Sequence, residues 1–268
     1  MKKLRIDQLL VERGFFESRE RAKTTVMSGL VFVNGQRVDK PGTAVDPEAA
    51  IEVRGDALPF VSRGGWKLDK ALKVFPVDPA GKTCIDCGAS TGGFTDVLLQ
   101  HGARKVYAVD VGYGQLAWKL RTDERVVNLE RTNLRYVTRE QVPEPLDLAV
   151  TDVSFISLRL ILPPVRELLK PGADFICLIK PQFEAGREEV GKKGVVRDEA
   201  VHRRVVTEIL SFAAEHGLSP QGLDYSPIRG PEGNIEYICH LKNAETEAAA
   251  LDVAAVVRAS HEAFQHEK

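Results

Sequence analysis

The sequence of 268 residues is 43% hydrophobic and 28% charged, which allows one or two folded domains with a buried core. Its formal net charge of −1 excludes a strongly basic field over the whole chain, so any nucleic-acid surface must be local. The apolar runs, such as residues 175–179, are far shorter than the roughly 20 residues that cross a bilayer, and no signal-peptide pattern follows the start. A cytoplasmic protein is therefore expected, and a membrane-lytic one is not.

The first 58 residues predict a small unit of two helices and a hairpin. Apolar residues from Ile6 to Val11 recur at helical spacing, and Ser18 is a good N-cap for a second helix that extends to Met27. Residues 29–38 are typical of a strand, an Asn-Gly turn and a second strand, and residues 51–53 of a closing strand.

Basic residues are concentrated in the first part of this unit. Arg19, Arg21 and Lys23 lie at the start of the second helix, and Arg5 is nearby in sequence. Such a cluster could neutralise several RNA phosphates. A solvated helix face is the alternative explanation for the same charges.

Three motifs in this unit resemble the S-four-type RNA-binding domain, a module named after a small-subunit ribosomal protein. They are R-x-D-x-x-L from Arg5, S-R-x-x-A from Ser18 and V-x-V-N-G from Val31, in this order. The resemblance covers roughly residues 1–58. It implies binding of structured RNA through the basic helix and the hairpin.

A proline and paired glycines at residues 59–65 predict a linker. Beyond it, strands are expected at 83–88, 105–111, 126–130, 146–153, 174–180 and 235–241, and helices near 92–101, 156–169 and 199–216, with an alanine-rich terminal helix over 244–265. This alternation predicts an α/β fold with a mostly parallel sheet covered by helices on both faces. The expected domains are therefore residues 1–58, a linker at 59–65, a second domain at 66–243 and a C-terminal tail at 244–268.

The first strand of the second domain ends in a glycine-rich turn, D-C-G-A-S-T-G-G-F, at residues 86–94. Open α/β sheets bind ligands where the carboxyl end of such a strand meets the following helix. The turn is neither a G-x-G-x-x-G nor a P-loop. Asp86, just before the first glycine, would repel a pyrophosphate but suits a ligand with sulfonium and ammonium groups. Asp110, which ends the next strand, is placed to accept hydrogen bonds from ribose hydroxyls.

These features predict S-adenosylmethionine as the cofactor. A dinucleotide ligand and a structural turn without a ligand are the alternatives. The residues expected to bind the cofactor are Asp86, Gly88, Ala89, Ser90, Gly92, Gly93, Phe94, Asp110, Asn133 and Asp152.

No metal site is expected. Cys84 and Cys87 form a C-x-x-C, but residues three apart on a strand point to opposite faces, and no second pair exists. The two cysteines are therefore expected in the core. The six histidines show no metal-binding spacing.

Two lysines and two acids are expected at one edge of the predicted sheet. Lys67 precedes the first strand, Asp152 ends the fourth, Lys180 ends the fifth and Glu236 opens the last. A lysine that follows five apolar residues needs a partner if it is buried, and Asp152 on the neighbouring strand can supply one. From the residues alone, a structural ion pair and a catalytic pair both remain open.

Residues 62–241 resemble the FtsJ-type ribose 2′-O-methyltransferases, whose mark is a Lys-Asp-Lys-Glu tetrad. The matching segments are S-R-G at 62–64, D-C-G-A-S-T-G-G-F-T at 86–95, T-D-V-S-F-I-S at 151–157, I-K-P-Q-F-E at 179–184 and G-P-E-G-N-I-E at 230–236. With the S-four-type domain, these segments resemble the TlyA or haemolysin A-like family. The resemblance implies a Rossmann-like S-adenosylmethionine-dependent methyltransferase with a seven-stranded sheet. It also implies catalytic roles for Lys67, Asp152, Lys180 and Glu236.

The implied reaction is methylation of a ribose 2′-hydroxyl in rRNA, within ribosomal subunits and with cytidine as the expected base. Lys180 would accept the hydroxyl proton or stabilise the alkoxide, and Asp152 would orient Lys180. Arg63 and Phe155 join Arg5, Arg19, Arg21 and Lys23 as expected RNA contacts. Phe155 could stack on an extruded base or lie in the core. An RNA-binding protein without methyl transfer and a small-molecule methyltransferase are the rival functions, and the oligomeric state is not predicted.

Overall fold

The computed structural model describes residues 3–16, 18–54, 59–230 and 232–265. The chain forms two compact units, residues 1–65 and 66–268. Residues 1–2, 17 and 55–58 of the expected first domain and the last three residues of the expected tail lie outside the described residues. Residues 59–65, expected as a linker, belong to the first unit, where the side chain of Phe60 is buried against Gly65.

The first unit packs helices α1 (Ile6–Glu12) and α2 (Arg19–Met27) with a three-stranded sheet of order β3 (Gln36–Val38), β2 (Val31–Val33) and β5 (Ile51–Val53). Asn34 and Gly35 adopt positive φ angles of 50° and 77°, which suits the tight turn between β2 and β3. Ser18 caps α2 by accepting a hydrogen bond from the backbone of Arg21. The elements expected here are confirmed, and a short pair, β1 (Leu4–Arg5) with β4 (Ala44–Val45), is added.

The second unit is built on a seven-stranded sheet of order β11-β12-β10-β9-β6-β7-β8. The strands are β6 (Thr83–Cys87), β7 (Lys105–Val109), β8 (Val126–Leu129), β9 (Leu146–Thr151), β10 (Leu169–Ile179), β11 (Ser219–Tyr225) and β12 (Tyr237–Lys242). The five strands β6 to β10 are parallel, and β12 is antiparallel to both β10 and β11. The predicted mostly parallel sheet is thus confirmed.

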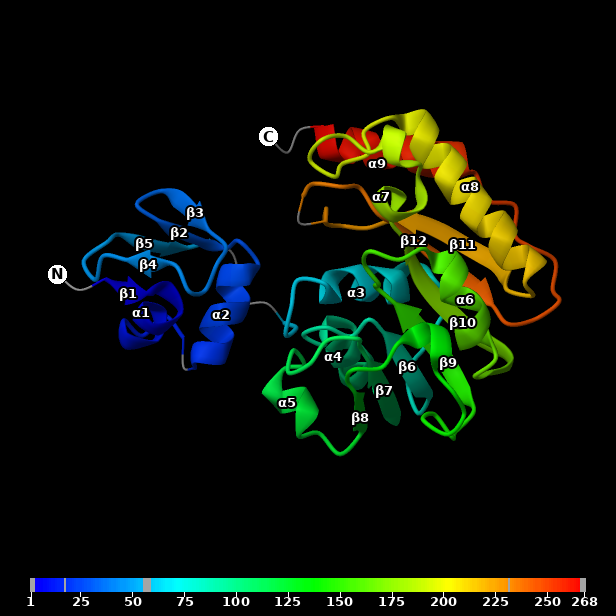
Figure 1. Ribbon diagram of the computed structural model, residues 1–268, viewed down its shortest axis with the longest axis horizontal. Helices are drawn as coiled ribbons and strands as arrows, with labels where there is room; N and C mark the ends of the chain where they lie inside the picture. The colour runs from blue at the N-terminus through cyan, green and yellow to red at the C-terminus, as the bar shows by residue number, and fades with distance from the viewer. Residues whose placement is uncertain (1–2, 17, 55–58, 231, 266–268) are drawn as a thin grey trace. The chain divides into compact units, whose positions relative to one another are not determined.

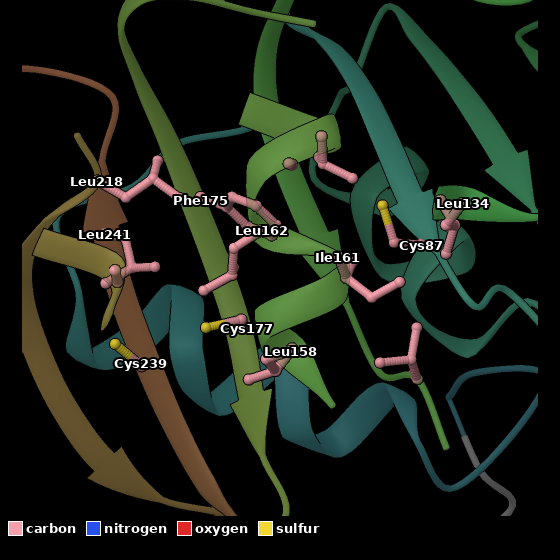
Figure 2. Packing of buried hydrophobic residues seen from close by; sticks show 14 of the residues in the cluster. Cys87, Leu134, Leu158, Ile161, Leu162, Phe175, Cys177, Leu218, Cys239 and Leu241 are labelled. Carbon is pink, nitrogen blue, oxygen red and sulfur yellow. The ribbon is translucent and has the colours of Figure 1, made fainter. Parts of the chain in front are cut away.

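Helices cover both faces of this sheet (Figure 1). They are α3 (Gly65–Val74), α4 (Gly93–Gln100), α5 (Trp118–Arg121), α6 (Leu162–Arg166), α7 (Pro181–Glu184), α8 (Glu199–Glu215) and α9 (Val253–Gln265), with 3-10 turns η1 (Leu134–Tyr136), η2 (Leu158–Leu160) and η3 (Arg187–Glu189). Figure 2 shows Leu158 and Leu162 among the buried side chains around Phe175 and Cys177 of β10. Among the described residues, no helix is long and apolar enough to cross a membrane.

Two of the expected elements are wrong in extent. The helix expected over 156–169 is only η2 and α6, because Leu169 already begins β10. The terminal helix begins at Val253 rather than at 244. The preceding segment instead lies against β11, where Ala249 N donates to Pro220 O over 2.9 Å and Thr246 O accepts from Ser219 Oγ. Tertiary hydrogen bonds therefore override the helical propensity of this alanine-rich stretch.

Candidate active site

Four charged side chains meet at the carboxyl end of the parallel strands in the second unit. Lys67 lies in the first turn of α3, Asp152 follows β9, Lys180 follows β10 and Glu236 precedes β12. Because β9 and β10 are parallel neighbours, the residues after them emerge at the same edge of the sheet. The antiparallel strand β12 begins at that edge. The structure thus brings together all four residues of the predicted tetrad.

Asp152 lies between the two lysines. Its Oδ1 is 2.6 Å from Nζ of Lys180, and its Oδ2 is 3.1 Å from Nζ of Lys67. Glu236 Oε2 contacts the same Lys67 Nζ over 2.7 Å. The side chains of Lys67, Lys180 and Glu236 are 8%, 7% and 2% exposed, whereas that of Asp152 is 19% exposed, so three of the four charges are shielded from water and Asp152 is partly accessible. Two cations and two anions balance one another, which is the condition for burying them.

The protonation of the central pair follows from these contacts. Burial opposes the charge on Lys67, but Asp152 and Glu236 outweigh it and raise the pKa of Lys67. Burial also opposes ionisation of Asp152, but Lys67 and Lys180 outweigh it and lower the pKa of that carboxyl. Lys67 is therefore an ammonium and Asp152 a carboxylate at neutral pH, so Lys67 acts as a fixed positive charge.

Ser154 is a site residue that the sequence analysis missed. Lys180 Nζ donates to its hydroxyl over 3.1 Å, in addition to its contact with Asp152. The signal was present, because Ser154 lies two positions after Asp152 in the segment T-D-V-S. The two contacts together fix the position of the Lys180 Nζ.

Phe155 follows directly, and its side chain is 91% exposed. The alternative of a core phenylalanine is therefore wrong. Its φ of +63° is unfavourable for a bulky residue, and its ring lies 5.1 Å from that of Phe183 in α7. Glu184, also in α7 and also missed by the sequence analysis, holds the segment by accepting from Ser157 Oγ over 2.6 Å and from Leu158 N over 2.7 Å.

The glycine-rich loop between β6 and α4 closes onto the end of β7. Gly88 and Gly92 have φ angles of 83° and 98°, and Ser90 also has a positive φ of 49°. A Cβ on Gly92 would lie 2.3 Å from the side chain of Leu120, so only glycine fits there. Asp110 accepts from the backbone amides of Ser90 over 2.8 Å and Gly112 over 2.7 Å, which ties the loop to the next strand.

Asp86 is 1% exposed, and one of its oxygens has a hydrogen-bond partner while the other does not. Its Oδ2 accepts from the Thr95 amide and hydroxyl over 2.9 and 2.7 Å, whereas Oδ1 has no hydrogen-bond partner within the described part of the chain. Burial, helped by the charges of Asp152 and Asp110, raises the pKa of Asp86 to about 7. A buried carboxylate with an unused oxygen is suited to a cationic ligand group.

The other residues predicted to bind the cofactor differ in exposure. Ala89, Gly93 and Phe94 are buried in the loop and the start of α4, whereas Ser90 and Asn133 are exposed. Asn133 caps η1 by accepting from the Arg135 amide over 3.1 Å.

The predicted RNA contacts of the first unit do not form one cluster. The guanidinium groups of Arg5 and Arg19 both bind the buried carboxylate of Asp7 and are half exposed. Lys23, one turn after Arg19, lies 3.8 Å from Glu20. Arg21 lies on another face of α2, because residues two apart in a helix do not face each other. Arg63 also belongs to this unit.

Metal-binding groups are dispersed in the described ranges, where no three His, Cys, Asp or Glu side chains gather as a possible metal site. Cys84 and Cys87 are free, fully buried thiols, which confirms the expectation that they lie in the core.

A mostly parallel seven-stranded sheet with β12 reversed, a glycine-rich loop after its first strand and an acid after the next define a Rossmann-like methyltransferase fold. Residues 60–243 match the FtsJ-like methyltransferases, and residues 4–51 match the S4 domain, the S-four-type module. The chain therefore belongs to the FtsJ-like methyltransferase family and carries an N-terminal S4 domain.

Similar proteins match nearly the whole chain at high sequence identity. YqxC of Bacillus subtilis is 53% identical, over 100% of this chain and 97% of its own length. The 16S/23S rRNA (cytidine-2′-O)-methyltransferase TlyA of Mycobacterium tuberculosis is 46% identical, over 92% of each chain. A solved structure from Streptococcus thermophilus with a hemolysin name is 46% identical, with a TM-score of 0.80 over 100% of this chain and 98% of that one. The predicted TlyA or haemolysin A-like relationship is confirmed.

Proposed function

We propose that this protein transfers a methyl group from S-adenosylmethionine to the 2′-hydroxyl of a cytidine in rRNA. The observation that carries the proposal is the tetrad, a network of ion pairs that runs from Glu236 through Lys67 and Asp152 to Lys180. It lies at the sheet edge where the glycine-rich loop also lies. The family and the name of the M. tuberculosis relative support the reaction and the substrate. The S4 domain supports an RNA partner, which we take to be ribosomal subunits in the cytoplasm.

The residues of the loop fit the proposed cofactor. When bound, S-adenosylmethionine supplies an electrophilic methyl group on a positively charged sulfur. The unpartnered oxygen of Asp86 suits the positive charge of such a ligand. The carboxylate oxygens of Asp110 each retain a lone pair for a ribose hydroxyl, although both already accept backbone hydrogen bonds. The remaining residues of the proposed cofactor site are Gly88, Ala89, Ser90, Gly92, Gly93, Phe94, Asn133 and Asp152.

The tetrad would act on the hydroxyl. As a neutral amine, Lys180 would accept the hydroxyl proton; as an ammonium, it would stabilise the negative charge that develops on oxygen while the proton passes to water. In both cases its Nζ must face that oxygen. Asp152 and Ser154 fix the position of this Nζ. Lys67, held by Glu236, keeps Asp152 ionised and in place. Such preorganisation of the hydroxyl opposite the methyl donor accounts for much of the expected rate enhancement.

Phe155 would stack on the base of the target nucleotide. An enzyme that methylates a ribose within folded RNA must expose the nucleotide, and an exposed aromatic ring next to the tetrad can bind the extruded base. Arg5, Arg19, Arg21, Lys23 and Arg63 would bind RNA phosphates from the first unit.

The test is to incubate wild type and Lys180→Ala with radiolabelled S-adenosylmethionine and either ribosomal subunits or deproteinised rRNA. We expect 2′-O-methylcytidine in nuclease digests with wild type, and a loss of turnover on the order of 10² or more in the variant, with unchanged affinity for S-adenosylhomocysteine. Transfer at the wild-type rate by Lys180→Ala would refute the role of Lys180. Label in small molecules alone would favour a small-molecule methyltransferase, and RNA binding without any label would favour a binding protein.

A further inference from the structure

A basic turn, Gly191-Lys192-Lys193-Gly194, lies in the connection between α7 and α8; we call it the lysine turn. Its backbone is closed by two hydrogen bonds, from Gly194 N to Gly191 O over 2.8 Å and from Gly191 N to Val195 O over 3.1 Å. Gly194 has a φ of +72°, which a glycine adopts readily. Both lysines occupy the tip and are exposed.

Two buried polar side chains hold the turn in place. Asn234, 3% exposed, donates from Nδ2 to Gly194 O over 2.8 Å and accepts from Val196 N over 3.1 Å. His202, fully buried, donates from Nε2 to Val196 O over 3.1 Å. The segment after the two lysines is therefore fixed at three backbone atoms. A fixed backbone lowers the entropy that would be lost when the turn binds a partner.

The same asparagine connects the turn to the tetrad. Asn234 lies two residues before Glu236, which contacts Lys67 over 2.7 Å. Following the chain from Lys193 through the hydrogen bond of Asn234 to Glu236 limits the separation of their Cα atoms to at most roughly 20 Å. The lysine turn therefore lies within a few nucleotides of any ribose that reaches the tetrad.

The positive charges of the lysine turn do not stabilise the fold through ion pairs within the described residues. Neither Lys192 nor Lys193 pairs with a carboxylate in the described part of the chain, and Arg197, which follows, is exposed as well. Within residues 191–197 all three charged residues are basic, and the acids of the connection flank this stretch on both sides. Exposed, unpaired and preorganised cations of this kind suit a phosphate backbone.

We propose that Lys192 and Lys193 bind phosphates of the RNA strand that carries the target nucleotide. The lysine turn would then be a second RNA contact, on the methyltransferase unit, that places the strand across the tetrad independently of the S4 domain. This inference rests on the proposed function, because it presumes an RNA substrate.

The test compares wild type with Lys192→Gln/Lys193→Gln and with a matched control, Lys170→Gln/Lys242→Gln. The control removes two exposed lysines at the sheet edge away from the tetrad, at the start of β10 and the end of β12. The side chains of Lys170 and Lys242 are 46% and 41% exposed. Binding of labelled, deproteinised rRNA is measured by filter retention from about 50 to about 300 mM NaCl, together with kcat, KM for RNA, affinity for S-adenosylhomocysteine and Tm.

We expect the lysine-turn variant to bind rRNA on the order of tenfold more weakly at low salt. The slope of log affinity against log salt should become shallower by about 1.4, the value for two lost contacts to a single strand. Its Tm and its affinity for S-adenosylhomocysteine should equal those of wild type. The control should match wild type in RNA affinity, salt slope and kcat.

If wild type methylates rRNA and the lysine-turn variant has the same salt slope as wild type, the inference is overturned and the proposed function stays intact. A defect seen only with whole subunits would also overturn it, in favour of a contact with a ribosomal protein. A wild type that binds no RNA would overturn both proposals together.

Discussion

Glu184 is the residue whose replacement tests the site most sharply. It accepts hydrogen bonds from Ser157 Oγ and Leu158 N, and these are the contacts that anchor the segment in which Phe155 has its unfavourable φ of +63°. We predict that Glu184→Ala releases this segment, so that the ring of Phe155 is no longer held in one position beside the tetrad. Hydrogen bonds to a carboxylate are worth about 1.5–3 kcal/mol each, enough to offset the strain of a single residue with positive φ.

The consequence for activity follows from what Phe155 contributes. Stacking of one base on an aromatic side chain is worth about 1–3 kcal/mol, so loss of the ordered ring should lower kcat/KM for RNA by roughly 5- to 150-fold. Affinity for S-adenosylhomocysteine should not change. Glu184→Gln is the conservative control, because its amide oxygen can accept from Leu158 N and its amide nitrogen can donate to Ser157 Oγ.

A double-mutant cycle separates this effect from general destabilisation. If Glu184 acts by placing Phe155, then Phe155→Ala alone should be about as defective as Glu184→Ala, and the double variant should be no worse than either. Single-turnover methylation of rRNA supplies the rates, and Tm reports folding. Additive defects, or full activity of Glu184→Ala, would show that Glu184 does not control Phe155.

Three further predictions concern the buried charges and the loop. Asp86→Asn should change how the free energy of unfolding depends on pH. Relative to the variant, wild type should lose up to a few kcal/mol of stability as pH rises from 3.8, the ordinary carboxyl pKa, to about 7, and should then level off. The reason is that Asp86 keeps its proton in the folded state over this range, whereas the unfolded chain releases it. Parallel denaturation curves across this range would contradict the raised pKa. Gly92→Ala should lose at least about 2 kcal/mol of stability and bind S-adenosylhomocysteine more weakly. A φ of 98° is strained for alanine, and its Cβ would clash with a side chain of α5. A neutral effect in denaturation and calorimetry would count against this packing. Lys67→Met should destabilise the second unit by about 3–5 kcal/mol, because Asp152 and Glu236 would lose the cation that both of them contact. An unchanged midpoint of denaturant unfolding would show that these carboxylates do not need the cation.

The sequence by itself determined the parts of this protein that depend on local pattern. The glycine-rich turn after β6 requires positive φ angles that glycine supplies, and the Asn-Gly turn between β2 and β3 does the same. The meeting of Asp152 and Lys180 was also predictable, because residues that follow parallel strands emerge at one edge of a sheet wherever those strands pair. Lys67, in a helix, and Glu236, before an antiparallel strand, joined them in the prediction through the family resemblance.

Only the tertiary structure decided features that depend on contacts between distant residues. Strand β11 contains proline and glycine and was not predicted, because its position is set by pairing with β12. The stretch before α9 was expected to be helical, but its backbone groups bind β11 instead. The segment that carries Phe155 is anchored by hydrogen bonds to Glu184, a residue of another element. Local propensity amounts to less than about 1 kcal/mol per residue, so long-range hydrogen bonds and packing outweigh it wherever the two conflict.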